Sequence, residues 1–577
     1  MSPQRRIRRR QAGETGHWPD DVLPLLRRVY AARGVLDPAQ ARPRLAQLPS
    51  PDTLTGIADA ARLLADAITG GGRILVVGDF DCDGATACAV AVRGLRMLGA
   101  RDVVHAVPNR IAHGYGLSPA LVEELAALRP QLLVTVDHGI ACHEGVRAAK
   151  AHGWQVLVTD HHLPGPTLPP ADAIVDPNLP GDAFAGKSLA GVGVIFYVLL
   201  ALRGVLRARG AFDGREPPDL RTLLDLVAVG TVADLVALDA GNRALVGAGL
   251  QRLRAGQGCA GLRALIEVSG REAARLTATD IAYAVGPRLN AAGRLEDMAI
   301  GIECLLCDEP ARALELARLL DRINAERRDV QQSMVDAAEA ALAARPLAFA
   351  GEPPAAVCLF DPDWHPGVVG LVASKLKERL HRPVVAFAPA EPGARLLRGS
   401  ARSIPGYHVR DALAAVQAAQ PGLIDRFGGH AMAAGLTLER DAFGAFEAAF
   451  CGQAARALDR DLLQAVIDSD GALQPHEFDR RHAEALRDGG PWGQGFPEPL
   501  FDGAFELLDA RQVGQRHLRM RLRVEGRREP VDAIHFGGWD GRGPPGRVRL
   551  AYRLAPDDYR GGEAVQLVVD YREDEAP

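Results

Sequence analysis

Short apolar runs alternate with helix-like stretches along the first 200 residues. The runs lie at 73–77, 102–107, 132–136 and 155–159. They have the length and β-branched content of buried strands, and the stretches between them, such as 84–98 and 118–128, have helical composition. Strands that alternate with helices predict βαβ units in a mainly parallel sheet. Such a sheet binds its ligands beyond the carboxyl ends of its strands.

The later pattern indicates further units. Residues 188–250 have helical composition, and 310–345 are almost continuous helix formers, long enough to connect two lobes. A second α/β unit is predicted over 355–455. After a bridge rich in Pro and Gly at 475–499, the segment 500–575 shows short alternating runs that predict strands.

Composition narrows the class of protein. A chain of 577 residues with 47% hydrophobic and 24% charged residues is expected to form roughly three or four globular domains. The net charge of −5 means that any surface for a polyanion is local. Eight cysteines without regular spacing fit a reducing compartment. The arginine-rich start predicts a disordered tail and no secretory signal, and no apolar run has the length of a membrane span, so we expect a cytoplasmic protein without membrane contact.

Acidic and imidazole side chains follow the predicted strands. The first strand runs into Gly78-Asp-Phe-Asp-Cys-Asp-Gly84, the third into Asp137-His138-Gly139 and the fourth into Asp160-His161-His162. So many carboxylates at one sheet edge raise one another's pKa, and divalent metal is the simplest compensation. Oxygen ligands with one or two imidazoles favour Mn²⁺ or Mg²⁺, and two such ions suit phosphoryl transfer. Taken alone, the first loop is also compatible with a Ca²⁺ loop or a solvated turn, but it lacks the downstream glutamate of an EF-hand.

These motifs resemble those of the DHH phosphoesterases, and more closely those of the RecJ family. The motifs are Gly78–Gly84, Val136–Gly139, Thr159–His162 and Gly230-Thr-Val-Ala-Asp234 for the superfamily, and Pro108-Asn-Arg110, His113–Ser118, Ser188–Gly193, Pro287–Arg294, Gly399–Arg402 and Phe427–His430 for the finer match. The resemblance spans residues 40–570. It implies an α/β fold: a DHH catalytic domain with a mainly parallel sheet, a long connecting helix, a DHH-associated α/β domain and a C-terminal OB-like β-barrel.

The resemblance also implies domain bounds. They are 1–40 for a basic tail and lead-in, 41–300 for the catalytic domain, 301–350 for the connecting helix, 351–458 for the DHH-associated domain, and 459–577 for a linker and the OB-like domain.

By resemblance, the metal ligands are Asp81, Asp83, Asp137, His161 and Asp234, with Asp137 bridging two ions of Mn²⁺ or Mg²⁺. Asp79 is a further ligand or holds the ligand shell, because Val77 stands where several relatives have a histidine. His162 would face the scissile phosphate. His138 departs from the expected Asp-Asn-Gly motif and either fills a supporting hydrogen-bonding place or adds a ligand.

The same resemblance implies contacts with the substrate. Ser400 and Arg402, between a strand and a helix of the second lobe, would bind a 5′-terminal phosphate, and Arg110 would share in phosphate binding. Tyr115 would stack on a base. The other expected contacts are Arg288, Asn290, Arg294, His430, and Arg519, Arg521 and Arg523 on one face of the strand 517–524.

The implied activity is a single-stranded-DNA-specific 5′→3′ exonuclease that releases 5′-mononucleotides, with a role in DNA repair and recombination. Expected partners are single-stranded DNA, a single-strand-binding protein and a helicase, and the expected state is a monomer. Two alternatives are a small-substrate DHH phosphoesterase that cleaves pyrophosphate or short oligonucleotides, and an inactive single-strand-binding protein. The extra domain with its arginine-faced strand argues against the first alternative, and the intact ligand set argues against the second.

Overall fold

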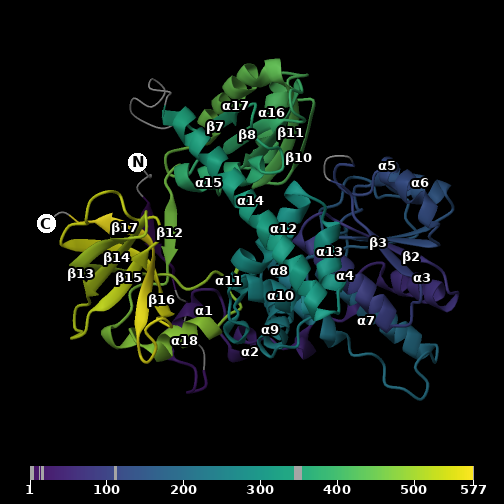
Figure 1. Cartoon of the computed structure of the whole chain (residues 1–577), viewed down its shortest axis with the longest axis horizontal. Coiled ribbons are helices and arrows are strands. Elements are labelled where there is room, and N and C mark those ends of the chain that lie inside the picture. Colours follow the sequence, from purple (N-terminus) through teal and green to yellow (C-terminus); the bar gives the residue numbers. More distant parts are fainter. Residues whose placement is uncertain (1–4, 12, 14–17, 110–112, 344–353, 576–577) are drawn as a thin grey trace. The chain divides into compact units, whose positions relative to one another are not determined.

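The computed structural model describes residues 5–11, 13, 18–109, 113–343 and 354–575. The chain divides into two compact units. The larger contains Arg9–Asn324 and Ser469–Pro577, and the smaller contains Met1–Arg8 and Ala325–Asp468 (Figure 1).

A five-stranded parallel sheet organises the first part of the larger unit. Its order is β3 (Val103–Ala106), β2 (Ile74–Gly78), β4 (Leu132–Val136), β5 (Gln155–Thr159) and β6 (Ala173–Val175). The four predicted strands are confirmed within one residue at most ends. The three-residue β6 was not predicted, because so short a run carries no readable periodicity.

Helices cover both faces of this sheet. On one face, Leu75 and Val77 of β2 pack with α5 (Pro119–Leu125) and α6 (His143–Ala151). On the other face, Ile74 and Val76 pack with α3 (Ile57–Thr69), α4 (Cys82–Met97) and α7 (Gly191–Ala208). Alternate residues of one strand thus enter two different cores, which explains its unbroken apolar sequence.

The sheet is preceded and followed by helices. They are α1 (Pro24–Ala31), α2 (Pro38–Ala41), α8 (Leu224–Ala233), α9 (Ala240–Arg254), α10 (Ala260–Val268), α11 (Ala278–Asp280), α12 (Gly286–Leu295) and α13 (Ala299–Leu306), with a π-helical turn at Ile281–Val285. Helix α7 is long and apolar enough to cross a membrane, which corrects the expectation that no apolar run has that length. Most of α7 is buried against α3, α4 and α8, as in the core helix of a globular domain.

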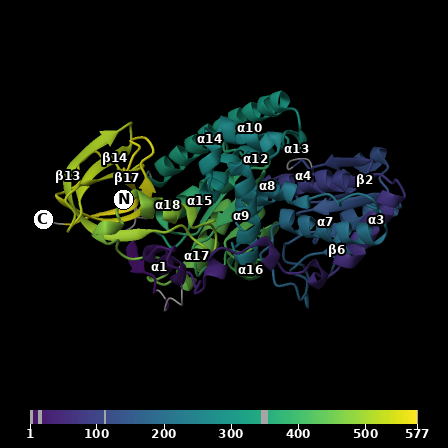
Figure 2. The same ribbon diagram turned by 90° about the horizontal axis from the view of Figure 1, so that it is seen from below.

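The long helix is confirmed as α14 (Pro310–Ala343), which begins in the larger unit and continues into the smaller one (Figure 2). The smaller unit then forms a five-stranded sheet. Its order is β10 (Arg426–Gly429), β11 (Ala433–Glu439), β9 (Leu396–Arg402), β8 (Val384–Pro389) and β7 (Val357–Phe360), with α15 (Val369–Leu380), α16 (Val409–Ala419) and α17 (Phe443–Ala457). Only β7 and β8 are parallel, so this is a mixed sheet.

The C-terminal segment is a closed five-stranded barrel, as predicted. Its order is β13 (Phe501–Val513), β14 (His517–Arg523), β15 (Val531–His535), β17 (Val565–Asp574) and β16 (Arg547–Pro556). Leu518, Met520 and Leu522 of β14 are buried in the barrel. The preceding bridge contains a helix, α18 (Arg480–Asp488), where only a linker was expected.

The expectation of a disordered basic tail is wrong for the described residues. Arg6–Arg9 form β1, which pairs with β12 (Val466–Ser469). Arg9 binds the buried carboxylate of Asp502 through two hydrogen bonds of 2.9 Å. The carboxylate of Asp502 reduces the repulsion among the positive charges of this segment, so the segment can adopt an ordered strand.

Candidate metal centre

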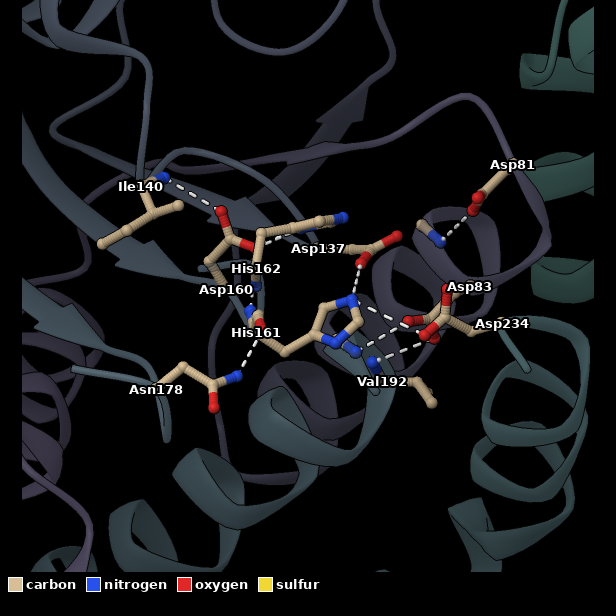
Figure 3. Close-up of polar contacts among 12 residues, drawn as sticks. Asp81, Asp83, Asp137, Ile140, Asp160, His161, His162, Asn178, Val192 and Asp234 are labelled. Atoms are coloured by element: carbon tan, nitrogen blue, oxygen red, sulfur yellow. Dashed lines mark hydrogen bonds and ion pairs between the residues drawn. The ribbon is translucent and has the colours of Figure 1, made fainter. Parts of the chain in front are cut away.

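The acidic and imidazole side chains that follow β2, β4 and β5 gather at the carboxyl edge of the parallel sheet, together with Asp234 at the end of α8 (Figure 3). Among the described residues, three sets have ligand atoms that lie within 4.8 Å of one another. They are Asp79, Asp81 and Asp137; Asp83, His161 and Asp234; and Asp137, His161 and His162. The first two sets share no residue, so the cluster has donors for two separate ions.

Asp83 is oriented by the first turn of α7. Its two carboxylate oxygens accept hydrogen bonds from the backbone N–H groups of Gly191 at 2.6 Å and Val192 at 3.1 Å. The unpaired N–H groups at a helix N-terminus favour a carboxylate there. A Cβ at Gly191 would lie 2.5 Å from the Asp137 Cβ, so only glycine permits this approach.

Asp137 lies at the centre of the cluster. It is buried, and its φ of 66° places a non-glycine residue in the left-handed region. Its Oδ1 lies 3.1 Å from His161 Nε2, which in turn lies 3.6 Å from Asp234 Oδ2. The 3.1 Å contact is an ion-pair distance but not a hydrogen bond. Within the described residues neither Asp137 Oδ1 nor His161 Nε2 has a hydrogen-bond partner. Backbone strain and orphaned buried atoms that converge on one point are typical of a ligand site.

The electrostatics also indicate a cation. Burial and the neighbouring aspartates raise the pKa of Asp137 and of Asp83 well above the usual range. Burial, with the charge of Asp81, raises the pKa of Asp234 to about 7. Burial lowers the pKa of His161 to about 4, so its imidazole is neutral and keeps a lone pair for a ligand. The donors are carboxylate oxygens with imidazole nitrogen, which fits Mn²⁺ or Mg²⁺.

A histidine–aspartate pair flanks the cluster. Burial favours the neutral forms of Asp160 and His162, but their hydrogen bond outweighs it: the pKa of Asp160 falls to about 2 and that of His162 rises to about 9. Asp160 also accepts the backbone N–H of Ile140 at 2.9 Å and of His161 at 2.7 Å. The sequence motif contained Asp160, but no role was predicted for it. Its burial and its hydrogen bonds identify it as the residue that orients the loop.

Tyr115 stands beside this pair. Its hydroxyl is 3.5 Å from His162 Nδ1, and its ring meets those of His162 and Phe80 edge to face at 6.0 Å. About half of the Tyr115 side chain is exposed. The predicted stacking residue is therefore close to the cluster, on a loop with glycines of positive φ at 114 and 116.

His138 is wholly buried, and its Nε2 lies 3.0 Å from the carbonyl oxygen of Val77. Because a carbonyl only accepts, Nε2 carries the proton. His138 thus ties the end of β4 to Val77 at the end of β2. It belongs to none of the three ligand sets.

Three of the other residues predicted to contact substrate lie on α12. Asn290 accepts the backbone N–H of Cys82 at 2.9 Å and so supports the acidic loop. Arg288 pairs with Asp321 at 2.8 Å, and Arg294 is half-buried near the end of α12. Arg110 lies outside the described residues.

The predicted phosphate pocket lies in the smaller unit. Ser400 and Arg402 are on β9 itself, which corrects their expected position between a strand and a helix. Arg402 donates to Ser400 Oγ at 2.8 Å and to Ser374 Oγ at 3.1 Å, and a Cβ at Gly370 in the first turn of α15 would lie 2.8 Å from its Nη2. His430 is exposed and follows β10 in this same unit.

On the barrel, the arginines of β14 alternate with its buried residues, as predicted. Arg519 lies 3.4 Å from Asp532 and Arg523 lies 3.0 Å from Glu506. Carboxylates therefore partly neutralise this face.

Three family models match the chain. The DHH family, N-terminal domain, matches residues 73–231, the DHHA1 domain matches 352–455, and the RecJ OB domain matches 469–571.

Close relatives cover nearly the whole chain. The single-stranded-DNA-specific exonuclease RecJ of Salmonella typhimurium is 49% identical over 577 residues, 99% of each chain. The protein of the same name from Thermus thermophilus is 37% identical over 96% of this chain and 76% of its own. The crystal structure of RecJ from Thermus thermophilus in complex with Mn²⁺ aligns with a TM-score of 0.78 at 34% identity, over 96% of this chain and 77% of that one. A structure of the Thermus protein with Mg²⁺ aligns with a TM-score of 0.73 at 32% identity, over 96% and 76% of the two chains. These matches confirm the predicted fold class and family: the chain belongs to the RecJ family of DHH proteins.

Proposed function

We propose that this chain is a metal-dependent exonuclease that degrades single-stranded DNA from its 5′ end and releases 5′-mononucleotides. The observation that carries the proposal is the pair of ligand sets without a common member at the carboxyl edge of the sheet. Relatives that align with 99% of the chain are named single-stranded-DNA-specific exonucleases, and this supports the choice of substrate.

Asp79, Asp81, Asp83, Asp137, His161 and Asp234 would hold two ions of Mn²⁺ or Mg²⁺. Ions held there would supply the Lewis-acid chemistry of phosphodiester hydrolysis. Asp137 lies in two of the ligand sets, which supports a bridging position. His162, kept cationic by Asp160, would bind a non-bridging oxygen of the scissile phosphate. Tyr115 would stack on the base beside it.

The 5′ end is proposed to bind at Ser400 and Arg402. The guanidinium of Arg402 is largely buried, and burial lowers its pKa. Gly370 lies in the first turn of α15 and next to both side chains, so the N-terminus of a helix is close to the guanidinium. This combination suits a phosphate.

The remaining contacts are proposed from the resemblance. Arg110, Arg288, Asn290, Arg294 and His430 would contact the strand or support its path, and Arg519, Arg521 and Arg523 would follow its backbone. We also propose the domain bounds given above, a monomeric state, a cytoplasmic location, and cooperation with a single-strand-binding protein and a helicase in DNA repair and recombination.

The proposal is tested by digesting end-labelled single-stranded and duplex DNA with Mn²⁺, using the wild type and Asp137→Ala. We expect mononucleotides from the 5′ end of single strands, and no release with EDTA or with the variant. Cleavage of pyrophosphate or dinucleotides with long strands left intact would overturn the exonuclease proposal in favour of a small-substrate phosphoesterase.

A further inference from the structure

A hollow of about 610 Å³ lies within the larger unit, apart from the metal centre. Four segments line it: the loop 41–46, helix α9, residues 277–279 at the start of α11, and the stretch 487–498 that leads to the barrel. Among the residues that the structure describes, none of those assigned above to metal or DNA lines it. Its volume falls in the range of small-molecule sites, and we call it the arginine pocket.

Positive charge dominates the lining of the arginine pocket. Its cations are Arg42, Arg44, Arg243, Arg254 and Arg487, and its carboxylates are Asp488 and Glu498. Arg487 pairs with Asp488 at 2.9 Å, and Glu498 pairs at 3.0 Å with Arg553, outside the lining. Among the described residues no carboxylate pairs with the other four arginines. Four positive charges thus remain without an ion-pair partner around one hollow.

Arg243 is the most informative of the four. Its side chain is nearly buried, with only 6% of the residue exposed. It donates to the carbonyl oxygens of Leu238 at 2.9 Å and Gln40 at 2.7 Å, and its Nε has no partner within the described residues. Burial lowers its pKa. Its guanidinium also lies over the Phe496 ring, 4.1 Å from the ring centre, and the nearby charge of Asp239 partly offsets the effect of burial on its pKa. A buried cation without an ion-pair partner is nevertheless costly, and an anion in the adjacent hollow would compensate it.

The rest of the lining suits a ligand with an apolar body. Ala244, Ala248 and Trp492 offer apolar surface, while Gln251 and Thr277 offer hydrogen-bonding groups. Guanidinium groups match phosphate oxygens in a bidentate geometry, and a phosphomonoester carries up to two negative charges near pH 7. We propose that the arginine pocket binds a phosphomonoester of the nucleoside monophosphate class.

The binding test uses the full chain in EDTA, so that the metal centre cannot retain phosphate. Deoxyadenosine monophosphate, inorganic phosphate and deoxyadenosine are titrated separately by calorimetry. An Arg402→Ala background removes the candidate site for a 5′-terminal phosphate. We expect saturable binding of the monophosphate in this background, and at least tenfold weaker binding of deoxyadenosine, which lacks the phosphate.

Two variants locate the binding site. Arg44→Glu reverses one exposed charge of the pocket. Gly247→Leu fills the hollow without changing charge, because a Cβ at Gly247 meets no atom within 4 Å and leucine suits a helix. Each is expected to weaken monophosphate binding at least tenfold. Arg207→Glu, which reverses an exposed arginine of α7 outside the pocket, is the matched control and should leave binding unchanged.

The outcomes separate the alternatives. If inorganic phosphate binds as tightly as the monophosphate, the result would support a phosphate site and identify free phosphate as its ligand. No binding of either compound, or equal binding by Gly247→Leu and the wild type, would overturn the proposal. Binding of an acidic peptide such as hexaglutamate alone would also overturn it, because the pocket would then be a protein-docking site. All of these titrations measure binding and none depends on DNA hydrolysis. Failure of the proposed exonuclease function would therefore leave their results unchanged.

Discussion

His162 Nδ1 lies 2.7 Å from Oδ1 of the buried Asp160, and this contact keeps the imidazole cationic. The two residues lie on the same loop after β5, so the strand end itself fixes their geometry. Charge and orientation of His162 therefore depend on a carboxylate that belongs to none of the three ligand sets.

Asp160→Asn is expected to lower kcat for single-stranded DNA by about 10- to 100-fold, in line with the loss of a residue that orients a functional group. The pKa of His162 should fall from about 9 toward its ordinary value, because the anion that holds its proton is gone. The alkaline limb of the pH–rate profile should move to lower pH. An unchanged profile with reduced kcat would show that Asp160 acts on the loop alone.

His138→Asn is expected to retain Mn²⁺ affinity, because an amide N–H replaces the donor to the Val77 carbonyl. His138→Leu should bind Mn²⁺ roughly 10-fold more weakly, because it leaves that carbonyl unpaired in a buried place beside Asp137. Electron paramagnetic resonance titration of Mn²⁺ measures both without substrate. Equal loss in the two variants would instead indicate that the imidazole is itself a ligand.

Asp234→Asn is expected to stabilise the metal-free protein at pH 8. The folded-state pKa of Asp234 is raised to about 7, mainly by burial, so the folded state binds more protons than the unfolded state between about pH 4 and 7. Stability contributed by this group therefore falls as pH rises through that window. The free energy of unfolding of the variant should exceed that of the wild type by roughly 1–3 kcal/mol at pH 8 in EDTA, and the two should differ little at pH 4.5.

Thermal unfolding at the two pH values checks that prediction, and Mn²⁺ provides its control. With saturating Mn²⁺ the wild type should become more stable than the variant, because ion binding stabilises the wild type and the variant has lost a ligand. A variant that is less stable than wild type in EDTA at pH 8 would contradict the raised pKa.

Arg9→Met is expected to destabilise the larger unit by about 1–2 kcal/mol, because it weakens the compensation of the buried Asp502 carboxylate while Arg549 remains 3.3 Å away. Arg8→Met is the matched control on the same strand. The Arg8 pair with Asp468 is exposed on both sides and should contribute less than about 1 kcal/mol. Urea unfolding measures both, and equal effects would contradict a specific role for Arg9.

The parallel sheet, the long helix and the strands of the C-terminal segment could be predicted from the sequence alone, because their signals are local. That these strands form a barrel was implied only by the resemblance to the RecJ family. Unbroken apolar runs identified β2, β4 and β5, and alternation identified β14. The acidic and imidazole side chains that follow β2, β4 and β5 likewise predicted a metal site, because parallel strands end at a common edge.

Features that depend on partners far away in the sequence could not be predicted from it. Arg9 is ordered because Asp502, almost 500 residues later, compensates its charge. Helix α18 forms where the local sequence, rich in Pro and Gly nearby, indicated a linker, and its buried face packs against the barrel strand β16. Asp137 adopts φ 66° in a space that Gly191 leaves open, and the arginine pocket exists only where α9 meets the stretch before the barrel. Long-range packing and charge compensation set these features, and no pattern within a short window contains them.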